Sequence, residues 1–535
     1  MPTKYSNEPL VLSLNRVKRA YIGGKLLDEW QGLENSKDNQ YPEEFLVSTV
    51  EVTNKDKYEG EGLSKVLLSD GAEAYLRDLI ASDYTSFLGE DYEGLKDVGV
   101  STRIGDTTVR IVLQCHPDTK FAQENLDFPN GKAEAWYILE TREIDGKKPV
   151  LYAGFKEGVT KEIWRKLFDE QDIQGMLDCL HKIEVKKGGT YFVDAGMPHC
   201  LGAGVMFLEV HEPCDYTFRL ERDYLGIREF SDYELHYGLG VDKLMDAFHF
   251  DTMTEEDMRN HCVINEPDGI GPDVLKDIDA YTQEELVSYK VTDRFKVEKL
   301  TIRSSFSMPI FEGGHRIGII TKGNAVFEFD GKHTVAEQGR GVYFPAEVDD
   351  LKITPQGKEV EMLICYPPKM PFNPSHAFKN PIQLGILVDD LDKYLSNLEN
   401  VLGWAPWRIA EFPPVGNEDV YREYKGEQSD FKAKFCFLHL GNIEIELIQP
   451  LEGKNIWRDW IDEHGQGIHH IKFLVPEHDD SKQYLKEKGI DLHQWGASVG
   501  PNAGKEWLFY NTYDKFGFDL ETMNYVIRKK PSNRD

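Results

Sequence analysis

The sequence predicts a mainly β protein with helical additions, followed by a C-terminal α+β region made of two βαβββ units. Three observations lead to this fold class. Residues 1–280 hold many short strand patterns with a few helical stretches between them. Residues 286–366 are almost entirely strand patterns divided by glycine-containing turns. Residues 382–404 and 468–490 share one layout of strand, acidic turn and amphipathic helix, and pairing two such copies would bury their sheet.

The length of 535 residues predicts more than one hydrophobic core. Composition and strand rhythm divide the chain into a first domain at 1–285, a second β domain at 286–366 and an α+β domain at 382–535. The segment 367–381, PPKMPFNPSHAFKNP, contains five prolines and is typical of a linker.

Charge and cysteine content exclude several function classes. A net charge of −31 repels nucleic acid and anionic membranes, so neither is expected as a partner. The sequence has no signal-peptide pattern and no apolar run of about 20 residues. The seven cysteines are scattered and outside CxxC pairs, which favours reduced thiols and a cytoplasmic location.

Side chains suited to metal binding stand at three places in the first domain. Gln114 and His116 are two apart in VRIVLQCHPD, so both leave the same face of a predicted strand. Lys132 and Glu134 have the same spacing in GKAEAWYIL, and His199 follows a tight glycine turn. An inward Glu134 among apolar neighbours needs a cation or strong donors, although an outward Glu134 on an amphipathic strand stays an alternative. One amide, two imidazoles and one carboxylate suit a divalent metal, zinc by preference.

Taken together, these segments resemble the type I phosphomannose isomerases of the cupin superfamily. The matching motifs, spread over residues 15–370, are Q-x-H-P-D at 114–118, G-K-x-E-x-W-Y at 131–137, A-G-x-P-H-x-x-G at 195–202 and D-Y-T-F-R at 215–219. The resemblance implies cupin (jelly-roll) β-barrels in which Gln114, His116, Glu134 and His199 bind one zinc ion. It also implies that Lys132 and Arg219 lie in the substrate pocket.

The region 286–366 corresponds to the family's C-terminal cupin. It contains only His315 and His333 and no H-x-H element, so we expect a metal-free structural domain. Two residues of the first domain depart from the family pattern: Asp194 stands in place of the usual proline, and Ala135 in place of the usual cysteine or methionine. The stretch LERDYLGIREF after Arg219 is also unusual. These departures leave the ligand set intact and the identity of the sugar open.

Aldose–ketose interconversion moves a proton between C1 and C2 through a cis-enediol. Lys132 is the candidate base, because a nearby cation would lower the pKa of its ammonium. The alternative is that Lys132 only binds phosphate. Arg219 suits a phosphate or the enediolate, since a guanidinium stays charged. Arg219 could instead be a salt-bridged strand residue, with Arg222 carrying the anion.

Residues 382–527 resemble the vicinal-oxygen-chelate superfamily, which contains glyoxalase I and methylmalonyl-CoA epimerase. In that fold each unit supplies one ligand from its first strand and one from its last. The resemblance implies a second divalent metal site (Mn, Co, Ni or Mg) at Gln383, Glu446, His470 and Glu521. The first position is usually histidine, and the substrate is not readable. His469 should point to the face opposite His470 and be structural.

The leading hypothesis is a zinc-dependent isomerase interconverting mannose 6-phosphate and fructose 6-phosphate, with a phosphorylated sugar as its partner. A second hypothesis assigns another sugar or sugar phosphate to the first domain and an isomerase or lyase step to the C-terminal domain. A third is a non-catalytic, metal-stabilised sugar-binding protein. The presence of Lys132 and Arg219 argues against the third, since pure binding needs no base. The sequence also allows a homodimer.

Overall fold

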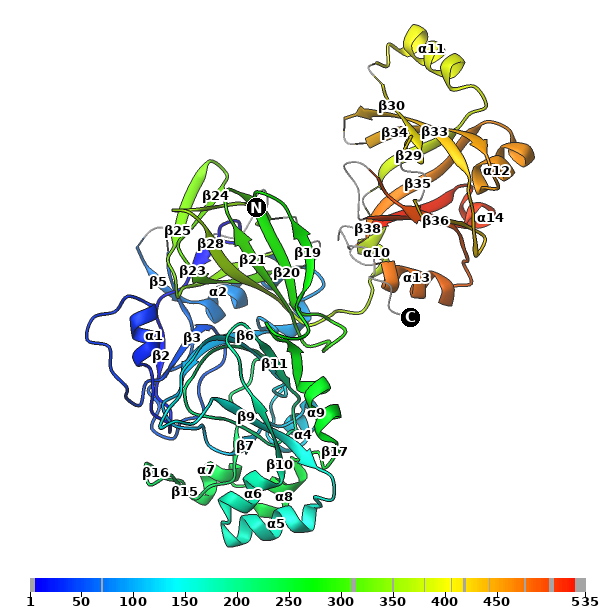
Figure 1. Cartoon of the computed structure of the whole chain (residues 1–535). Helices are drawn as coiled ribbons and strands as arrows, with labels where there is room; N and C mark the ends of the chain where they lie inside the picture. The colour runs from blue at the N-terminus through cyan, green and yellow to red at the C-terminus, as the bar shows by residue number, and fades with distance from the viewer. Residues whose placement is uncertain are drawn as a thin grey trace. The chain divides into compact units, whose positions relative to one another are not determined.

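The chain divides into two compact units, Met1–Met370 and Pro371–Asp535, in a computed structural model (Figure 1). Each unit is described by itself. The structure describes residues 5–68, 71–308, 314–348, 351–379, 381–405, 407–416, 420–441, 443–475, 478–499 and 505–524.

Two sheets enclose the first β-barrel of the first unit. Within the described residues, the larger sheet has the strand order β18-β11-β8-β13-β6-β3-β2, and the smaller has the order β10-β9-β12-β7-β14 with β17 beside β9. The strands of the larger sheet are β2 Arg16–Val17, β3 Glu43–Val47, β6 Ser101–Asp106, β8 Glu134–Thr141, β11 Thr190–Val193, β13 Val205–His211 and β18 Val263–Asn265. Those of the smaller sheet are β7 Gln114–Cys115, β9 Val150–Lys156, β10 Leu180–Glu184, β12 His199–Leu201, β14 Phe218–Arg219 and β17 Thr252–Met253.

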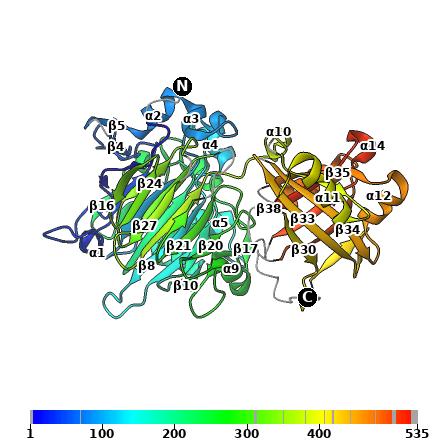
Figure 2. The same cartoon turned by 90° about the horizontal axis from the view of Figure 1, so that it is seen from above.

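A second pair of sheets forms a second barrel in the same unit (Figure 2). The larger of these has the order β1-β26-β23-β28-β21-β20-β19 and the smaller the order β22-β27-β24-β25 in the described part of the chain. The strands are β1 Leu10–Val11, β19 Asp273–Asp277, β20 Tyr281–Val287, β21 Lys296–Ile302, β22 Phe306–Ser307, β23 Arg316–Lys322, β24 Ala325–Phe329, β25 Lys332–Ala336, β26 Gly341–Phe344, β27 Lys352–Pro355 and β28 Val360–Tyr366. Two hairpins lie outside both barrels: β4 Lys65–Leu67 with β5 Glu73–Tyr75, and β15 Asp223–Tyr224 with β16 Arg228–Glu229.

Three hydrophobic layers hold these four sheets together. Alternation along β8 shows how: Trp136 and Ile138 pack into the first barrel, whereas Ala135 faces the other way, toward the second barrel. Ala135 there shares a core with Ile317 and Leu363 from the second barrel's larger sheet. The two large sheets therefore pack against each other, and each barrel has its own core on the far side.

Short helices complete the first unit. In α5 (Lys161–Glu170) Trp164 and Phe168 are buried one helical turn apart, and Thr160 caps the helix start. Helix α4 (Thr119–Asn125) is capped by Asp118, whose Oδ1 accepts a hydrogen bond from the Phe121 N–H at 2.6 Å. The cap fixes the chain direction just after His116. The remaining helices are α1 Lys25–Trp30, α2 Leu76–Ser82, α3 Tyr84–Leu88, the 3-10 turn Glu93–Leu95, α6 Ile173–Asp178, α7 Asp232–His236, α8 Val241–Asp246 and α9 Glu255–Cys262.

The second unit is built around one long sheet. Its strand order in the described residues is β30-β33-β34-β29-β35-β38-β37-β36-β31-β32. The antiparallel pair β29–β35 joins two βαβββ copies, and each of these strands has the last strand of its own copy beside it in parallel. The first copy is β29 Pro381–Leu387, α11 Leu391–Leu402, β30 Arg408–Phe412, β33 Lys432–Leu440 and β34 Ile443–Glu452. The second is β35 Gly467–Val475, α13 His478–Glu487, β36 Leu492–Ala497, β37 Glu506–Tyr510 and β38 Asp519–Asn524.

The remaining elements of this unit are α10 Pro374–Ala377, α12 Ile456–His464, α14 Tyr513–Phe516, β31 Arg422–Tyr424 and β32 Glu427–Gln428. The two units together have the mainly β fold with a paired βαβββ region that the sequence predicts. Among the described residues, no helix is both long enough and apolar enough to cross a bilayer.

Candidate metal and substrate sites

Neighbouring strands of the first barrel bring the predicted residues of the first unit together. In the smaller sheet, Gln114 on β7 is paired with His199 on β12 on one side and with Arg219 on β14 on the other. Glu134 begins β8 in the larger sheet. His116 lies two residues beyond Gln114, between the end of β7 and the start of α4.

The four predicted ligands converge in the interior of the barrel. Glu134 Oε1 lies 3.1 Å from His199 Nε2, and Glu134 Oε2 lies 3.4 Å from His116 Nε2. The amide nitrogen of Gln114 is 3.2 Å from His199 Nε2 and 3.4 Å from His116 Nε2. All four side chains are buried. The carboxylate, both imidazoles and the amide therefore share one small volume.

Backbone carbonyls fix which imidazole nitrogens face this volume. His116 Nδ1 lies 2.8 Å from the carbonyl oxygen of Tyr216, and His199 Nδ1 lies 2.9 Å from that of Met197. A carbonyl only accepts hydrogen bonds, so both Nδ1 atoms carry the proton and both Nε2 lone pairs point inward. Burial, aided by the Lys132 charge, lowers the pKa of His116 to about 3, which keeps its ring neutral.

This donor set fits a cation. Glu134 Oε1 is buried and accepts no hydrogen bond, although His199 Nε2 is close to it. Two acceptors that face each other repel unless a positive group lies between them. The geometry suits a divalent metal held by His116, Glu134 and His199, with the Gln114 amide turned to present its oxygen.

Lys132 lies against this cluster with its side chain only 1% exposed. Its Nζ is 3.0 Å from His116 Nε2, forms an ion pair with Glu134 and is 2.8 Å from Glu209 Oε1. Glu209 in turn pairs with Arg103 at 2.8 Å. Lys132 therefore has two carboxylate partners, and only one of them belongs to the metal cluster.

Lys132 belongs to a buried chain of ion pairs. The sequence predicted no role for several members of this chain. Neighbouring charges alternate in sign along the chain, which runs Glu134, Lys132, Glu209, Arg103, Glu43, Arg19 and Asp215. A signal was available for Glu209, which stands in the apolar strand VMFLEVH just as Glu134 stands in EAWYIL. Arg19 carried no such signal, because it lies in an N-terminal segment without a strand pattern.

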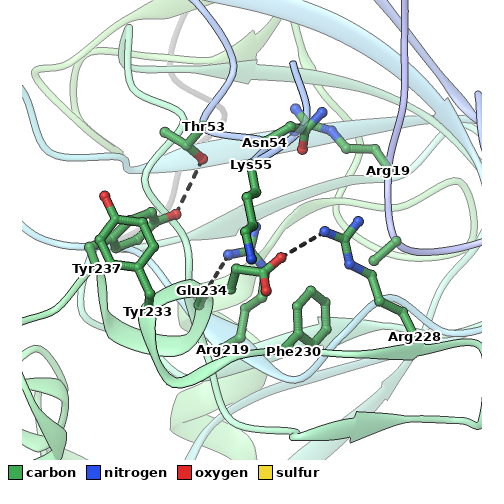
Figure 3. Close-up of a pocket in the computed structure, with 11 residues that line it drawn as sticks. Arg19, Thr53, Asn54, Lys55, Arg219, Arg228, Phe230, Tyr233, Glu234 and Tyr237 are labelled. Carbon is green, nitrogen blue, oxygen red and sulfur yellow. Dashed lines mark hydrogen bonds and ion pairs between the residues drawn. The ribbon is translucent and has the colours of Figure 1, made fainter.

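A pocket lies beside the cluster. Gln114 and Glu134 line it together with Arg19 and Arg219. Both arginines also line an adjoining pocket with Lys55, Arg228 and other residues (Figure 3). Arg219 therefore lies where the two pockets meet.

The alternative reading of Arg219 as a salt-bridged strand residue does not match the structure. Its Nη1 donates hydrogen bonds to the carbonyls of Thr217 and Glu234, and its guanidinium lies over the Phe230 ring. Among the described residues it has no carboxylate partner. Arg222, the alternative anion carrier, instead pairs with Asp232 and lines neither pocket.

The histidines of the second barrel lie apart from this site. His315 is fully buried, and its two ring nitrogens lie 3.2 Å from the Leu88 carbonyl and 2.8 Å from the Val98 carbonyl. It is a core histidine. His333 lies exposed on β25.

The second unit contains a second cluster on its central strands. His470 Nε2 lies 3.2 Å from Glu446 Oε2 and 3.1 Å from Glu521 Oε2. All three side chains are buried, and Glu521 Oε2 accepts no hydrogen bond. The ligand atoms lie close enough to hold one metal ion, so this donor set also fits a cation. Its two carboxylates make it more anionic than the first cluster.

Two further side chains of the second unit, Gln383 and His469, make contacts that the sequence did not predict. The amide nitrogen of Gln383 donates to Glu444 Oε1 at 2.6 Å, while its Oε1 is buried without a hydrogen-bond partner. His469 does not face away from His470, because their Nδ1 atoms are 3.0 Å apart. The pairing of β29 with β35 shifts register at this point, so strict alternation is lost there.

Sequence reasoning missed two residues of the second cluster. Lys472 is buried two residues after His470, with Nζ 3.0 Å from Glu521 Oε1. Gly385 lies beside the His470 ring, where an added Cβ would come within 1.8 Å of Cε1. A carboxylate-rich cluster with a buried lysine in HHIKFLV could have indicated the first, whereas nothing in the sequence indicates the second.

Comparisons with known proteins find relatives for both regions of the chain. Residues 382–509 match the Glyoxalase/Bleomycin resistance protein/Dioxygenase superfamily. The chain is 25% identical over 253 residues to YvyI of Bacillus subtilis (strain 168), whose assignment as a mannose-6-phosphate isomerase is itself inferred; this covers 47% of the chain and 70% of YvyI. It is 30% identical over 122 residues to the mannose-6-phosphate isomerase ManA of the same organism, which covers 22% of the chain and 35% of ManA.

The crystal structure of mannose 6-phosphate isomerase from Bacillus subtilis superposes with a TM-score of 0.52 at 19% identity, over 67% of this chain and all of that one. The class defined by fold and site is thus a pair of cupin barrels with one buried metal-type cluster. The N-terminal region matches the mannose-6-phosphate isomerases, and the C-terminal region is a glyoxalase-superfamily domain. Both resemblances inferred from the sequence are confirmed.

Replacing Glu134 with glutamine should remove metal from the first cluster. The amide keeps the shape of the side chain but loses the charge, so zinc affinity should fall by more than about 100-fold. Equilibrium dialysis followed by metal analysis measures this. Glu140→Gln on the exposed end of the same strand is the control, and equal zinc binding by the two variants would contradict the assignment.

Replacing Gly385 with alanine should displace the His470 ring. The new methyl group would overlap the imidazole, so we expect about 1–3 kcal/mol loss of stability and weaker metal binding by the second unit. Urea unfolding and Mn²⁺ titration measure the two effects. Gly467→Ala, whose Cβ would meet only Trp460 at 3.5 Å, is the matched control.

Proposed function

We propose that the first unit is a zinc-dependent isomerase that interconverts mannose 6-phosphate and fructose 6-phosphate through a cis-enediol intermediate. The observation that carries this proposal is the convergence of Gln114, His116, Glu134 and His199, of which Gln114 and Glu134 also line a pocket. A bound zinc ion would supply Lewis-acid polarisation of the sugar carbonyl at this position. A pure sugar-binding site would have no need of the buried lysine beside the ligands.

Lys132 moves the proton between C1 and C2. Lys132 lines neither pocket, and its Nζ lies 3.0 Å from His116 Nε2, which favours proton transfer over phosphate binding. Glu209 and Glu134 orient the amine, so its position does not depend on substrate.

The phosphate group of the substrate is held by Arg219 and Lys55 at the adjoining pocket shown in Figure 3. Four cations line this pocket, but Arg19 pairs with Glu43 and Asp215, and Arg228 pairs with Glu234. Among the described residues, Lys55 and Arg219 are the lining cations that have no carboxylate partner. An anion bound there would compensate both charges.

The loop that carries Lys55 is tied to the buried ion-pair chain. The Thr53 N–H donates to Asp215 Oδ2 at 2.7 Å, and the Thr53 hydroxyl lies 3.2 Å from the Tyr237 hydroxyl (Figure 3). This fixes the backbone two residues before Lys55. The lysine therefore reaches the pocket from an ordered position.

In the second unit, Glu446, His470 and Glu521 would hold a second divalent metal, such as Mn²⁺. The cluster is buried and rich in carboxylate oxygen, which suits such an ion better than a soft metal. The substrate of this unit stays unassigned.

Purified full-length protein should convert mannose 6-phosphate to fructose 6-phosphate, and a chelator should abolish the conversion. Added zinc should restore it, because the cluster residues need the ion to polarise the carbonyl. A coupled assay for fructose 6-phosphate measures the rate. Protein that contains zinc but converts no hexose phosphate would contradict the proposed function.

Replacing Lys55 with methionine should raise KM for mannose 6-phosphate by about tenfold and leave kcat nearly unchanged. The lysine touches only the phosphate, which binds equally in the ground state and the transition state. Lys57→Met is the matched control, since Lys57 lies in the same loop, pairs with Glu51 and lines neither pocket. An equal KM for the two variants would contradict the phosphate position.

A further inference from the structure

The second unit has a buried lysine at its metal-type cluster, and the contacts of this lysine differ from those of Lys132. The side chain of Lys472 is 6% exposed, and its Nζ is 3.0 Å from Glu521 Oε1. Glu521 is the only carboxylate with which Lys472 forms an ion pair among the described residues. The nearby Glu444 instead accepts a hydrogen bond from Gln383 and pairs with His439.

In the first unit, a metal ion bound by Glu134 would still leave the positive charge of Lys132 paired with a carboxylate. Glu209 remains as its partner at 2.8 Å, and Glu209 is not a predicted ligand. The first cluster is thus built to hold a metal ion and a lysine together.

In the second unit, a metal ion would take the carboxylate on which Lys472 depends. Glu446 and Glu521 supply two negative charges, and Lys472 supplies one positive charge in the same buried space. A dication would leave that group with a net positive charge and a buried ammonium without its ion pair. Such a buried charge is costly.

We propose that Lys472 is a built-in counter-ion that competes with a divalent metal for Glu446 and Glu521. The second unit then has two states, one with the ammonium paired to the carboxylates and one with metal bound and the ammonium displaced. The 3.0 Å contact with the Glu521 carboxylate is the geometry of an ion pair, so the competitor is a cation. The second site therefore exchanges its metal readily, whereas the first retains its own.

The test is Mn²⁺ titration of the full-length Glu134→Gln variant, whose first cluster is expected to bind no metal. Free Mn²⁺ is measured by electron paramagnetic resonance. Replacing Lys472 with methionine should tighten Mn²⁺ binding by at least about tenfold, because a unit charge beside the ion is removed. Lys432→Met, on the exposed part of β33, is the matched control and should not change the affinity.

A purely structural role would give a different result. Lys472→Met would then lower the melting temperature without tightening Mn²⁺ binding, and that outcome overturns the proposal. Under the proposal, the metal-free variant melts earlier than its parent, and saturating Mn²⁺ restores it through a larger shift than in the parent. A variant that folds only with Mn²⁺ present supports the proposal.

Lys472→Gln is the second variant, and failure of both variants to fold even with saturating Mn²⁺ overturns the proposal. The metal content of the unsubstituted protein is a further measurement. After dialysis into metal-free buffer without chelator, it should keep its metal in the first unit and lose it from the second. Retention of two metal equivalents would count against competition by Lys472.

Discussion

The ion pair between Lys132 and Glu209 is the interaction on which the first site depends. Both groups are buried, and their charged atoms are 2.8 Å apart. Removing such ions from water costs several kcal/mol each, so each must keep a partner. Lys132 also forms an ion pair with Glu134, and Glu209 also forms one with Arg103. The carboxylate that faces the two imidazoles is therefore positioned by a charge that is not itself a ligand.

The same need for an oppositely charged partner extends from the metal cluster to the pocket that Lys55 lines. Arg103 pairs with Glu43, Glu43 with Arg19, and Arg19 with Asp215. Asp215 then binds the backbone of the loop before Lys55. A chain of alternating charges thus fixes both ends of the site, and a break at any point would leave a buried charge unpaired. Under the proposed function, this chain of ion pairs connects the cluster that would act on the sugar's carbonyl with the pocket that would bind its phosphate.

The sequence predicted the parts of the site that alternation along a strand determines. Gln114 and His116 were expected on one face of a strand because they are two residues apart, and an inward Glu134 was weighed against an outward one. All three side chains are buried. The fold class and the repeat in the second unit followed from the same rhythm. Arg19 and Lys55 could not be predicted, because they lie in segments without periodicity whose position depends on tertiary contacts. The face of His469 was wrong for a related reason: a register shift interrupts the alternation beside it.

Both sites place a lysine two residues from a ligand in the sequence: Lys132 precedes Glu134, the first residue of β8, and Lys472 follows His470 on β35. Period two is the shortest spacing that puts a cation and a ligand on one face of a sheet, so the recurrence needs no common ancestry of the two units. The two sites differ in the carboxylate that a neighbouring strand places beside the lysine. In the first unit β13 contributes Glu209, an extra carboxylate outside the metal cluster, whereas in the second the carboxylate paired with Lys472 is Glu521 of β38, itself a cluster member. The number of carboxylates beside each lysine, and not the ligands themselves, then decides whether metal and ammonium are held together or in alternation.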